Sequence, residues 1–330
     1  MATLVHPPAS PPRFALENVP PTALRKLRFP ALGTTCDVQY AAPGGKVQAE
    51  TFEHAAVSWV SNFEAKYSRF RPTSLVSRIN DAAGRAWTEV DEDMERMLQL
   101  CDALFAMTSG VLDPTALPLI QLWNWKSRPT ALPSEAAITA AQRLVGWNKV
   151  QRKPGQIFLP EAGMALDFGG FGKEYAVDLV AQIAADHGIA NVLVDFGHDL
   201  RVRGAPPGRP AWHIGLEDPR SPGSSAESLA VAGDTGVASS GDYLRHCEIA
   251  GRRYGHIIDP RTGRPVANGC QQATIIADTC LQAGVLSTTA FVLGVPRGLE
   301  FIQSYPRAEG LLVTDNARAQ TRGFCRYVAA

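Results

Sequence analysis

A glycine-rich segment between two apolar stretches constrains the fold more than any other feature of this chain. Residues 165–180 read ALDFGGFGKEYAVDLV, in which an apolar run stops at Asp167, three glycines follow within four residues, and a helical apolar pattern comes next. Glycine permits turns and close backbone approaches that other residues do not. The order predicts a strand over 156–168, a glycine turn, and a helix over 173–187 that Gly188 ends.

Strands and helices are mixed along the rest of the chain without strict alternation. Apolar residues at helical spacing predict helices over 46–66, 91–109, 134–144 and 280–293, with a further helix starting at Pro296. Short apolar runs predict strands over 28–41, with a break at Gly33, and over 191–196, 211–216, 228–233, 271–277 and 310–315. Because a strand is expected on each side of the helix after the glycines, we predict an α+β fold with at least one βαβ-like unit.

Composition indicates one folded unit after a short lead-in. Of the 330 residues, 45% are hydrophobic and 19% are charged, which supports a large core and argues against disorder. Residues 1–25 are rich in proline and contain no apolar signal core, so we expect an extended lead-in there and one domain over 26–330. A cytoplasmic location is the better expectation, although a periplasmic one stays open if a signal was trimmed from the N-terminus.

Charge, apolar runs and cysteines argue against several classes of protein. Lys+Arg and Asp+Glu both number 32, so the zero net charge does not predict a nucleic-acid surface. No apolar run reaches the roughly 18 residues of a membrane-spanning helix. The six cysteines contain no CxxC pair, which argues against a zinc knuckle or a thioredoxin-type site, and we expect buried reduced thiols.

The glycine segment fits neither of the common phosphate loops. A P-loop requires a glycine five residues before its Gly-Lys pair and a Ser or Thr after it, but Asp167 and Glu174 occupy those positions. A dinucleotide fingerprint requires a third glycine where Tyr175 stands. Both standard interpretations are therefore rejected.

The same segment nevertheless has the chemistry of an anion site. Gly169, Gly170 and Gly172 allow backbone N–H groups to approach a ligand, and the positive end of the following helix points to the same place. Lys173 adds a point charge. The alternative is a glycine turn that only lets a strand pack against a helix.

Two further segments carry groups suited to a phosphate or a proton. In YSRFRPTS, Arg69 and Arg71 flank Phe70; guanidinium groups match phosphate geometry and the ring could stack on a ring system, although a solvated loop is the alternative. In GHIIDPRTG, His256 stands three residues before Asp259. A lone histidine is usually not catalytic, but one so close to an Asp-Pro turn favours a functional role.

Taken in order, these segments resemble the FAD:protein FMN transferase family, the ApbE-type flavin transferases. The resemblance extends from Leu32 to Gly294 and rests on GTT, SRFRPTSLVSRIN, SGVLDPTALPLIQLW, LDFGGFGKEYAVD, VLVDFGHDL, SSGDY and GHIIDPRTGRPV. It implies an α+β, T-fold-like ApbE architecture with mixed or antiparallel sheets and packed helices. It also implies that residues 26–330 form a flavin transferase-like catalytic domain.

The resemblance implies a reaction as well as a fold. Members of the family bind FAD and, with a divalent cation that is usually Mg²⁺, cut its pyrophosphate, attach FMN through a phosphoester to a threonine of a target flavoprotein, and release AMP. The implied partners are therefore FAD and an acceptor flavoprotein with a threonine-containing motif. This chain contains no obvious motif of that kind, so self-modification is not expected.

Matching positions assign the family's roles to residues of this chain. The resemblance implies that His256 handles the threonine proton, and a histidine pKa near neutrality suits that role. Asp259 would orient the turn or His256. The implied FAD-binding residues are Arg69, Phe70, Arg71, Gly169, Gly170, Lys173, Asp242, Tyr243 and Thr262.

The expected metal site departs from the family pattern. The family holds its cation through a carbonyl of the glycine loop, here Gly172, a threonine, here Thr288, and an aspartate, where this chain has Gly284. A carboxylate instead stands at Glu174, where the family usually has glycine. We hypothesise that Glu174 replaces the missing aspartate as the metal ligand, with Asp278 as a weaker candidate. Alternatively, Glu174 pairs with a nearby lysine or arginine.

Two consequences of these departures stay open at the level of sequence. His198, in DFGHDL, also replaces a usual glycine and could narrow the cleft or add a ligand. An active FMN transferase is the favoured function. The alternatives are a non-catalytic FAD-binding protein that has lost its metal site and a metal-dependent FAD pyrophosphatase that yields FMN and AMP.

Overall fold

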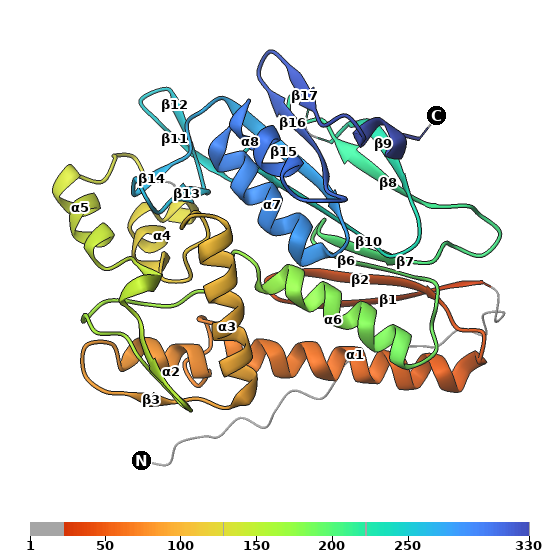
Figure 1. Ribbon diagram of the computed structural model, residues 1–330, viewed down its shortest axis with the longest axis horizontal. Helices are drawn as coiled ribbons and strands as arrows, with labels where there is room; N and C mark the ends of the chain where they lie inside the picture. Colours follow the sequence, from red (N-terminus) through yellow and green to blue (C-terminus); the bar gives the residue numbers. More distant parts are fainter. Residues whose placement is uncertain (1–22, 128, 222, 330) are drawn as a thin grey trace.

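A large antiparallel sheet is the central element of the computed structural model, which describes residues 23–127, 129–221 and 223–329 (Figure 1). Neighbouring strands follow the order β1-β2-β6-β7-β10-β15-β16-β17, and each pair runs antiparallel. The strands are β1 (Leu24–Ala31), β2 (Thr34–Ala41), β6 (Val192–Phe196), β7 (Leu200–Arg203), β10 (Thr235–Gly241), β15 (Cys270–Ala277), β16 (Glu309–Thr314) and β17 (Arg318–Gln320). Strands from the beginning and the end of the described chain therefore form the two opposite edges of one sheet.

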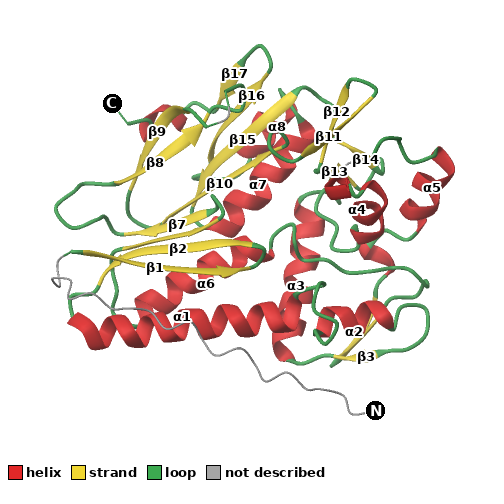
Figure 2. Cartoon of the chain, turned by 180° about the vertical axis from the view of Figure 1, so that it is seen from behind, coloured by secondary structure: helices red, strands yellow, loops and turns green. Residues whose placement is uncertain are grey.

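Helices cover one face of this sheet (Figures 1 and 2). They are α1 (Gly45–Tyr67), α6 (Gly172–Asp186), α7 (Cys280–Leu293) and α8 (Arg297–Gln303). In β6, Val192, Val194 and Phe196 belong to the core on the helix side, whereas Leu193 belongs to the core on the opposite face. This alternation follows from the two-residue period of a strand.

A hairpin covers part of the opposite face. It consists of β8 (Trp212–Glu217) and β9 (Ser225–Val231), and the 3-10 turn η3 (Phe324–Tyr327) packs beside it. Trp212, Leu229 and Phe324 form a core there with residues of β7, β10, β15 and β16. Because both of its faces are covered, β15 is buried along its whole length.

A second group of elements packs against the helix side of the sheet, at the left of Figure 1. Its helices and turns are α2 (Leu75–Asp81), α3 (Glu92–Met107), α4 (Leu117–Trp123), η1 (Trp125–Ser127), α5 (Glu135–Arg143) and η2 (Trp147–Lys149). Its small sheet has the order β3 (Thr88–Glu89), β5 (Gln156–Phe158), β4 (Gln151–Lys153). Two ribbons complete the fold: β11 (His246–Ile249) with β12 (Arg252–Gly255), and β13 (Ile258–Asp259) with β14 (Arg264–Pro265).

The predicted βαβ-like unit is wrong. The strand before the glycines, β5, ends at Phe158 and belongs to the small sheet, whereas β6 belongs to the large one. Residues 159–168 run as a partly buried loop with an exposed turn at 161–163, and Pro160 cannot donate to a sheet ladder. The Asn80 side chain instead satisfies the backbone of Leu166, accepting from its N–H (2.6 Å) and donating to its carbonyl (3.0 Å).

The other predicted helices and turns agree with the structure. The helices expected over 46–66, 91–109 and 280–293 correspond to α1, α3 and α7. The break at Gly33 is the turn of the β1–β2 hairpin. Ser134 caps α5, accepting a hydrogen bond from the Ala137 N–H at 3.2 Å.

Three further expectations concern the chain as a whole. The predicted lead-in lies outside the described residues up to position 22, and β1 begins at Leu24. Five of the six cysteines are buried and unpaired, as expected, but Cys325 is exposed. Within the described residues, no helix has the length and apolar character needed to cross a membrane.

Candidate active site

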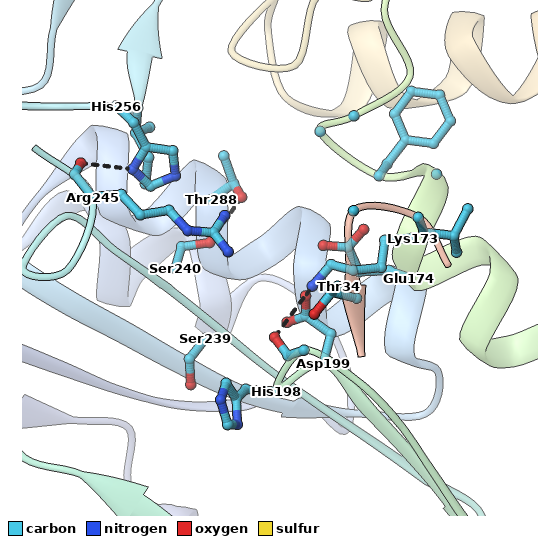
Figure 3. Close-up of a pocket in the computed structure, with 18 of the residues that line it drawn as sticks. Thr34, Lys173, Glu174, His198, Asp199, Ser239, Ser240, Arg245, His256 and Thr288 are labelled. Carbon is cyan, nitrogen blue, oxygen red and sulfur yellow. Dashed lines mark hydrogen bonds and ion pairs between the residues drawn. The ribbon is translucent and has the colours of Figure 1, made fainter. Parts of the chain in front are cut away.

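A cleft of about 1210 Å³ is lined by both groups of elements (Figure 3). Its walls come from segments far apart in the sequence: the β1–β2 turn, the glycine loop, the β6–β7 turn, β10 with the loop after it, and residues 256–258. Loops held by a rigid scaffold commonly carry functional groups. A concave site of this size is the natural candidate for binding a ligand.

The glycine loop supplies space rather than unusual backbone geometry. Gly169, Gly170 and Gly172 do not have positive φ, and a Cβ built on Gly170 would meet nothing closer than 3.6 Å. The Gly169 N–H donates to Asp167 Oδ1 (3.0 Å), and the Gly172 N–H donates to the Phe168 carbonyl (2.6 Å). Of these three glycine N–H groups, only that of Gly170 is not bonded within the loop.

Helix α6 places Glu174 against α7, and Asp178 fixes how the two helices meet. The Asp178 carboxylate accepts hydrogen bonds from the N–H groups of Cys280 and Leu281, both at 2.9 Å, in the first turn of α7. Residues four apart lie on one helix face, so Glu174 also faces α7. A Cβ built on Gly284 would lie 2.6 Å from Glu174 Cγ. Position 284 and the Glu174 side chain therefore compete for one space.

Glu174 is buried with one oxygen unsatisfied. Its Oε2 has no hydrogen-bond partner among the described residues. Burial, reinforced by the nearby Asp199 carboxylate, raises the pKa of Glu174 well above the ordinary value of a glutamate. A buried carboxyl group in this position requires a proton or a cation.

Lys173 and the second candidate carboxylate, Asp278, have other partners than Glu174. Lys173 Nζ forms an ion pair with Asp199 rather than with Glu174, which argues against the alternative considered from sequence. Asp278 forms an ion pair with Arg307 and is not among the residues that line the cleft.

Thr288 lies one helical turn after Gly284, on the same face of α7. It lines the cleft, and its hydroxyl is 2.9 Å from Ser240 Oγ of β10. Ser240 is also 2.8 Å from the Ser287 hydroxyl. A chain of hydroxyl groups therefore joins α7 to the sheet at the base of the cleft.

His256 lies across the cleft from Lys173 and Glu174 (Figure 3). The Arg245 carbonyl accepts a hydrogen bond from the His256 N–H (2.9 Å) and lies 3.2 Å from Nδ1. A carbonyl can only accept, so Nδ1 carries the proton and Nε2 keeps a lone pair. Burial, helped by the Arg245 guanidinium, lowers the pKa of His256 to about 4, below the near-neutral value expected from sequence. The ring is therefore a neutral base at physiological pH.

The order of motifs and the fold match one family of known proteins. A sequence profile described as the ApbE family matches residues 32–312. This chain belongs to the ApbE family. The α+β class and the ApbE architecture predicted from sequence are thereby confirmed, in antiparallel form.

Individual ApbE relatives are similar over most of the chain. An FAD:protein FMN transferase of Vibrio cholerae is 28% identical over 252 residues, which cover 76% of this chain and 75% of the relative. One of Haemophilus influenzae is 29% identical over 265 residues, 78% of this chain and 77% of the relative. The crystal structure of the ApbE protein of Thermotoga maritima has a TM-score of 0.83 at 30% identity, covering 93% of this chain and 100% of that one. The flavin transferase ApbE of Vibrio cholerae has a TM-score of 0.82 at 25% identity, with the same coverage.

Only part of the arginine segment that was matched to the ApbE family lines the cleft. Arg69 and Phe70 line the cleft, with the guanidinium 4.1 Å from the ring centroid and 3.0 Å from Asp167. Phe70 is 72% exposed, so its ring is open to a ligand. Arg71 is bound to Glu64 at 2.6 Å and is not among the cleft-lining residues.

The last two residues of the SSGDY segment also differ in whether they line the cleft. Tyr243 lines the cleft, and its hydroxyl donates to Glu217 at 2.8 Å. Asp242 is buried, pairs with Arg253 at 3.2 Å and does not line the cleft. Asp242 therefore supports the loop that carries Tyr243.

Asp259 and Thr262 organise the turn that follows His256. The Asp259 carboxylate binds the Arg261 guanidinium through two contacts of 2.9 Å, and its carbonyl accepts the Thr262 N–H at 3.1 Å. Neither residue is among those that line the cleft. Of the two roles expected for Asp259, the described contacts support orienting the turn.

Sequence reasoning missed several polar residues of the cleft, among them Asp199, Ser240 and Arg245. Asp199 lies within VLVDFGHDL and Ser240 within SSGDY, but only the folded arrangement shows that they meet Lys173 and Thr288. His198 lines the cleft with φ of 72°, in the tight turn between β6 and β7. Histidine tolerates this left-handed conformation better than most residues.

Proposed function

We propose that this protein is an FAD:protein FMN transferase, which moves FMN from FAD to a threonine of an acceptor flavoprotein and releases AMP. The observation that carries the proposal is the neutral His256, whose Nε2 has no hydrogen-bond partner among the described residues and which shares a cleft with the glycine loop and Lys173. Membership of the ApbE family and the names of its relatives support the reaction type.

The reaction needs a nucleophile, a base and compensation of charge. The threonine Oγ would form a bond to the FMN phosphorus of FAD, while the bond from that phosphorus to the bridging oxygen breaks and AMP leaves with the bridge. His256 Nε2 would take the threonine proton. Because the pKa of His256 is lowered to about 4, the basic form is available at physiological pH.

A divalent cation fits the wall formed by α6 and α7. When bound, it would neutralise charge on the diphosphate oxygens. The unsatisfied Glu174 Oε2 and its position in the space next to Gly284 support Glu174 as the carboxylate ligand. The Gly172 carbonyl and the Thr288 hydroxyl complete the proposed set, and such oxygen ligands suit Mg²⁺. No cluster of three His, Cys, Asp or Glu suited to a metal is found in the described chain, so phosphate oxygens would supply further ligands.

The proposed transfer is tested with purified protein, FAD, Mg²⁺ and a threonine-containing flavoprotein that an ApbE relative modifies. We expect equal amounts of AMP, by chromatography, and of acceptor carrying FMN, by mass spectrometry. An acceptor with its threonine replaced by alanine is the control. Free FMN together with AMP would instead identify an FAD pyrophosphatase. Bound FAD without AMP would identify a non-catalytic FAD-binding protein.

The proposed metal ligand is tested by binding rather than by turnover. Mn²⁺ is titrated into the protein with FAD and without acceptor, and free Mn²⁺ is followed by electron paramagnetic resonance. Glu174→Gln should weaken Mn²⁺ binding by at least about tenfold. Asp278→Asn is the matched control, because its carboxylate is engaged by Arg307 away from the cleft. Equal affinity in Glu174→Gln and wild type would reject Glu174 as a ligand.

A further inference from the structure

Most cationic side chains of the cleft already have partners. Arg69 is bound to Asp167 at 3.0 Å, and Lys173 forms an ion pair with Asp199. Lys126 has no carboxylate partner among the described residues, but its ammonium lies 5.9 Å from the ring centroid of Phe70. These three side chains are therefore compensated, wholly or in part, before any ligand binds.

Arg245 is the exception among the lysines and arginines that line the described cleft. It follows Tyr243 in the loop after β10 and is exposed. Its guanidinium makes no hydrogen bond, ion pair or ring contact with the described residues, although its carbonyl holds His256. In Figure 3 the Arg245 side chain runs from beside the His256 ring toward Ser240 and Thr288. A full positive charge is thus presented to the cleft, next to the neutral base.

We infer that Arg245 binds the diphosphate of FAD and stabilises the negative charge that the transfer develops there. The inference rests on the proposed function, because that function supplies a diphosphate to the cleft. A guanidinium group matches phosphate oxygens through two parallel hydrogen bonds. An unpaired cation that faces the point of charge development is the usual means of stabilising such a reaction.

The geometry also explains why the two groups are adjacent. The Arg245 carbonyl fixes the tautomer of His256, and the guanidinium of the same residue disfavours a second positive charge on the ring. One residue therefore keeps His256 able to accept a proton and brings a cation to the leaving phosphate. A protonated His256 in place of that cation could not act as the base.

The inference is tested by the binding of FAD to Arg245→Gln, followed by flavin fluorescence without metal or acceptor. The loss of a charge-assisted hydrogen bond should raise the Kd for FAD by about 10- to 100-fold. Riboflavin, which has no phosphate, should bind both proteins equally. Arg96→Gln is the matched control, because the Arg96 guanidinium is engaged by Asp93 and does not line the cleft.

A conservative variant separates charge from shape. Arg245→Lys should recover part of the FAD affinity, because it keeps the charge and loses the paired hydrogen bonds. In turnover with acceptor, Arg245→Gln should lower kcat as well as raise KM, since charge stabilisation grows during the reaction. An unchanged Kd for FAD in Arg245→Gln would overturn the inference. Equal weakening of FAD and riboflavin would also overturn it, because it would indicate a structural role.

The outcomes distinguish this inference from the proposed function. If the wild type modifies the acceptor while Arg245→Gln binds FAD normally, the function holds and the inference fails. If the wild type binds FAD without transfer and Arg245→Gln binds it weakly, the binding part of the inference holds and the function fails. Absence of FAD binding in the wild type would reject both.

Discussion

The two walls of the cleft differ in how their charges are compensated. On the wall made by α6 and α7, Lys173 is paired with Asp199, and Glu174 is buried with a raised pKa. On the opposite wall, His256 is neutral and the exposed Arg245 guanidinium makes no ion pair with the described residues. Folding itself organises the first wall, because burial fixes its groups in place. On the second wall, His256 Nε2 and the Arg245 guanidinium have no partner among the described residues, so these two groups are left to act on a substrate.

The largest expected effect is on the rate of FMN transfer, and it tests the wall that carries His256 and Arg245. His256→Asn removes the basic Nε2 while keeping a polar side chain of similar size. Loss of a general base should lower the rate of FMN transfer by about 10²- to 10⁴-fold. FAD affinity should stay near that of the wild type, because the diphosphate is held elsewhere. Single-turnover release of AMP and a fluorescence titration measure the two quantities, and a wild-type rate would remove His256 from the mechanism.

The next effect is on metal binding at the wall formed by α6 and α7. It is tested by moving the carboxylate from position 174 to position 284. Glu174→Gly should weaken Mn²⁺ binding by at least about tenfold, since it removes the proposed carboxylate. Adding Gly284→Asp should restore the affinity, because an aspartate there would occupy the space that Glu174 fills, where a Cβ would lie 2.6 Å from Glu174 Cγ. A double variant as weak as the single one would show that the two positions are not interchangeable.

A smaller effect concerns packing rather than charge on the same wall. Gly284→Ala places a methyl group against the buried Glu174 side chain, which should lower the free energy of unfolding by about 1–3 kcal/mol. In a Glu174→Gly background the same change should not destabilise, because the space is then open. Urea denaturation of the four proteins measures both terms. A stabilising Gly284→Ala in the wild type would show that Glu174 moves aside freely, since alanine has the higher helix propensity.

The smallest expected effect is a change in how kcat/KM depends on pH. With the pKa of His256 lowered to about 4, the acid limb of kcat/KM should lie near pH 4 instead of near the ordinary value of about 6.5. Removing the neighbouring cation in Arg245→Gln should raise the pKa of His256, so the limb should move toward higher pH. An acid limb that stays at the same pH in Arg245→Gln would show that the guanidinium does not act on His256. The rate profile is measured between pH 3.5 and 8 with the acceptor present, in steps of about half a unit so that a shift of one unit is resolved.

The free energy of unfolding should also depend on pH through His256. Between pH 6.5 and about pH 4 the unfolded chain binds a proton at this histidine and the folded chain does not. The free energy of unfolding should therefore fall as pH decreases through this range. His256→Asn should show a shallower fall in a series of thermal melts, and an identical slope would contradict the neutral ring.

Much of the fold could be predicted from local patterns, whereas the strand prediction that failed did so for a non-local reason. The helices α1, α3 and α7 appeared at their expected places because apolar spacing records which face is buried. The run 159–168 has the apolar content of a strand, yet it packs as loop, because Leu166 bonds to the Asn80 side chain and Asp167 to the Pro114 carbonyl instead of to a neighbouring strand. Apolar content predicts burial, whereas strand pairing depends on a partner elsewhere in the chain.

The sequence named several residues of the candidate site, but it did not show which of them face the cleft. Family resemblance selected Lys173 and His256, a departure from the family pattern selected Glu174, and all three line one cleft. It also selected Arg71, Asp242 and Thr262, which the structure places outside the lining. A motif preserves the identity of residues that build a loop as well as those that face a ligand, so sequence alone does not separate the two.

The sequence by itself determined the order of elements, the family motifs, and the unusual pair of a glycine at 284 and a carboxylate at 174, because all of these are properties of residue type and spacing. Only the tertiary structure decided that this pair shares one space, that Asp199 neutralises Lys173, and that Arg245 lies beside His256 with no ion pair to any described residue. Those facts depend on distances between segments far apart in the chain. Such distances are set when helices pack on a sheet, and no local pattern encodes them.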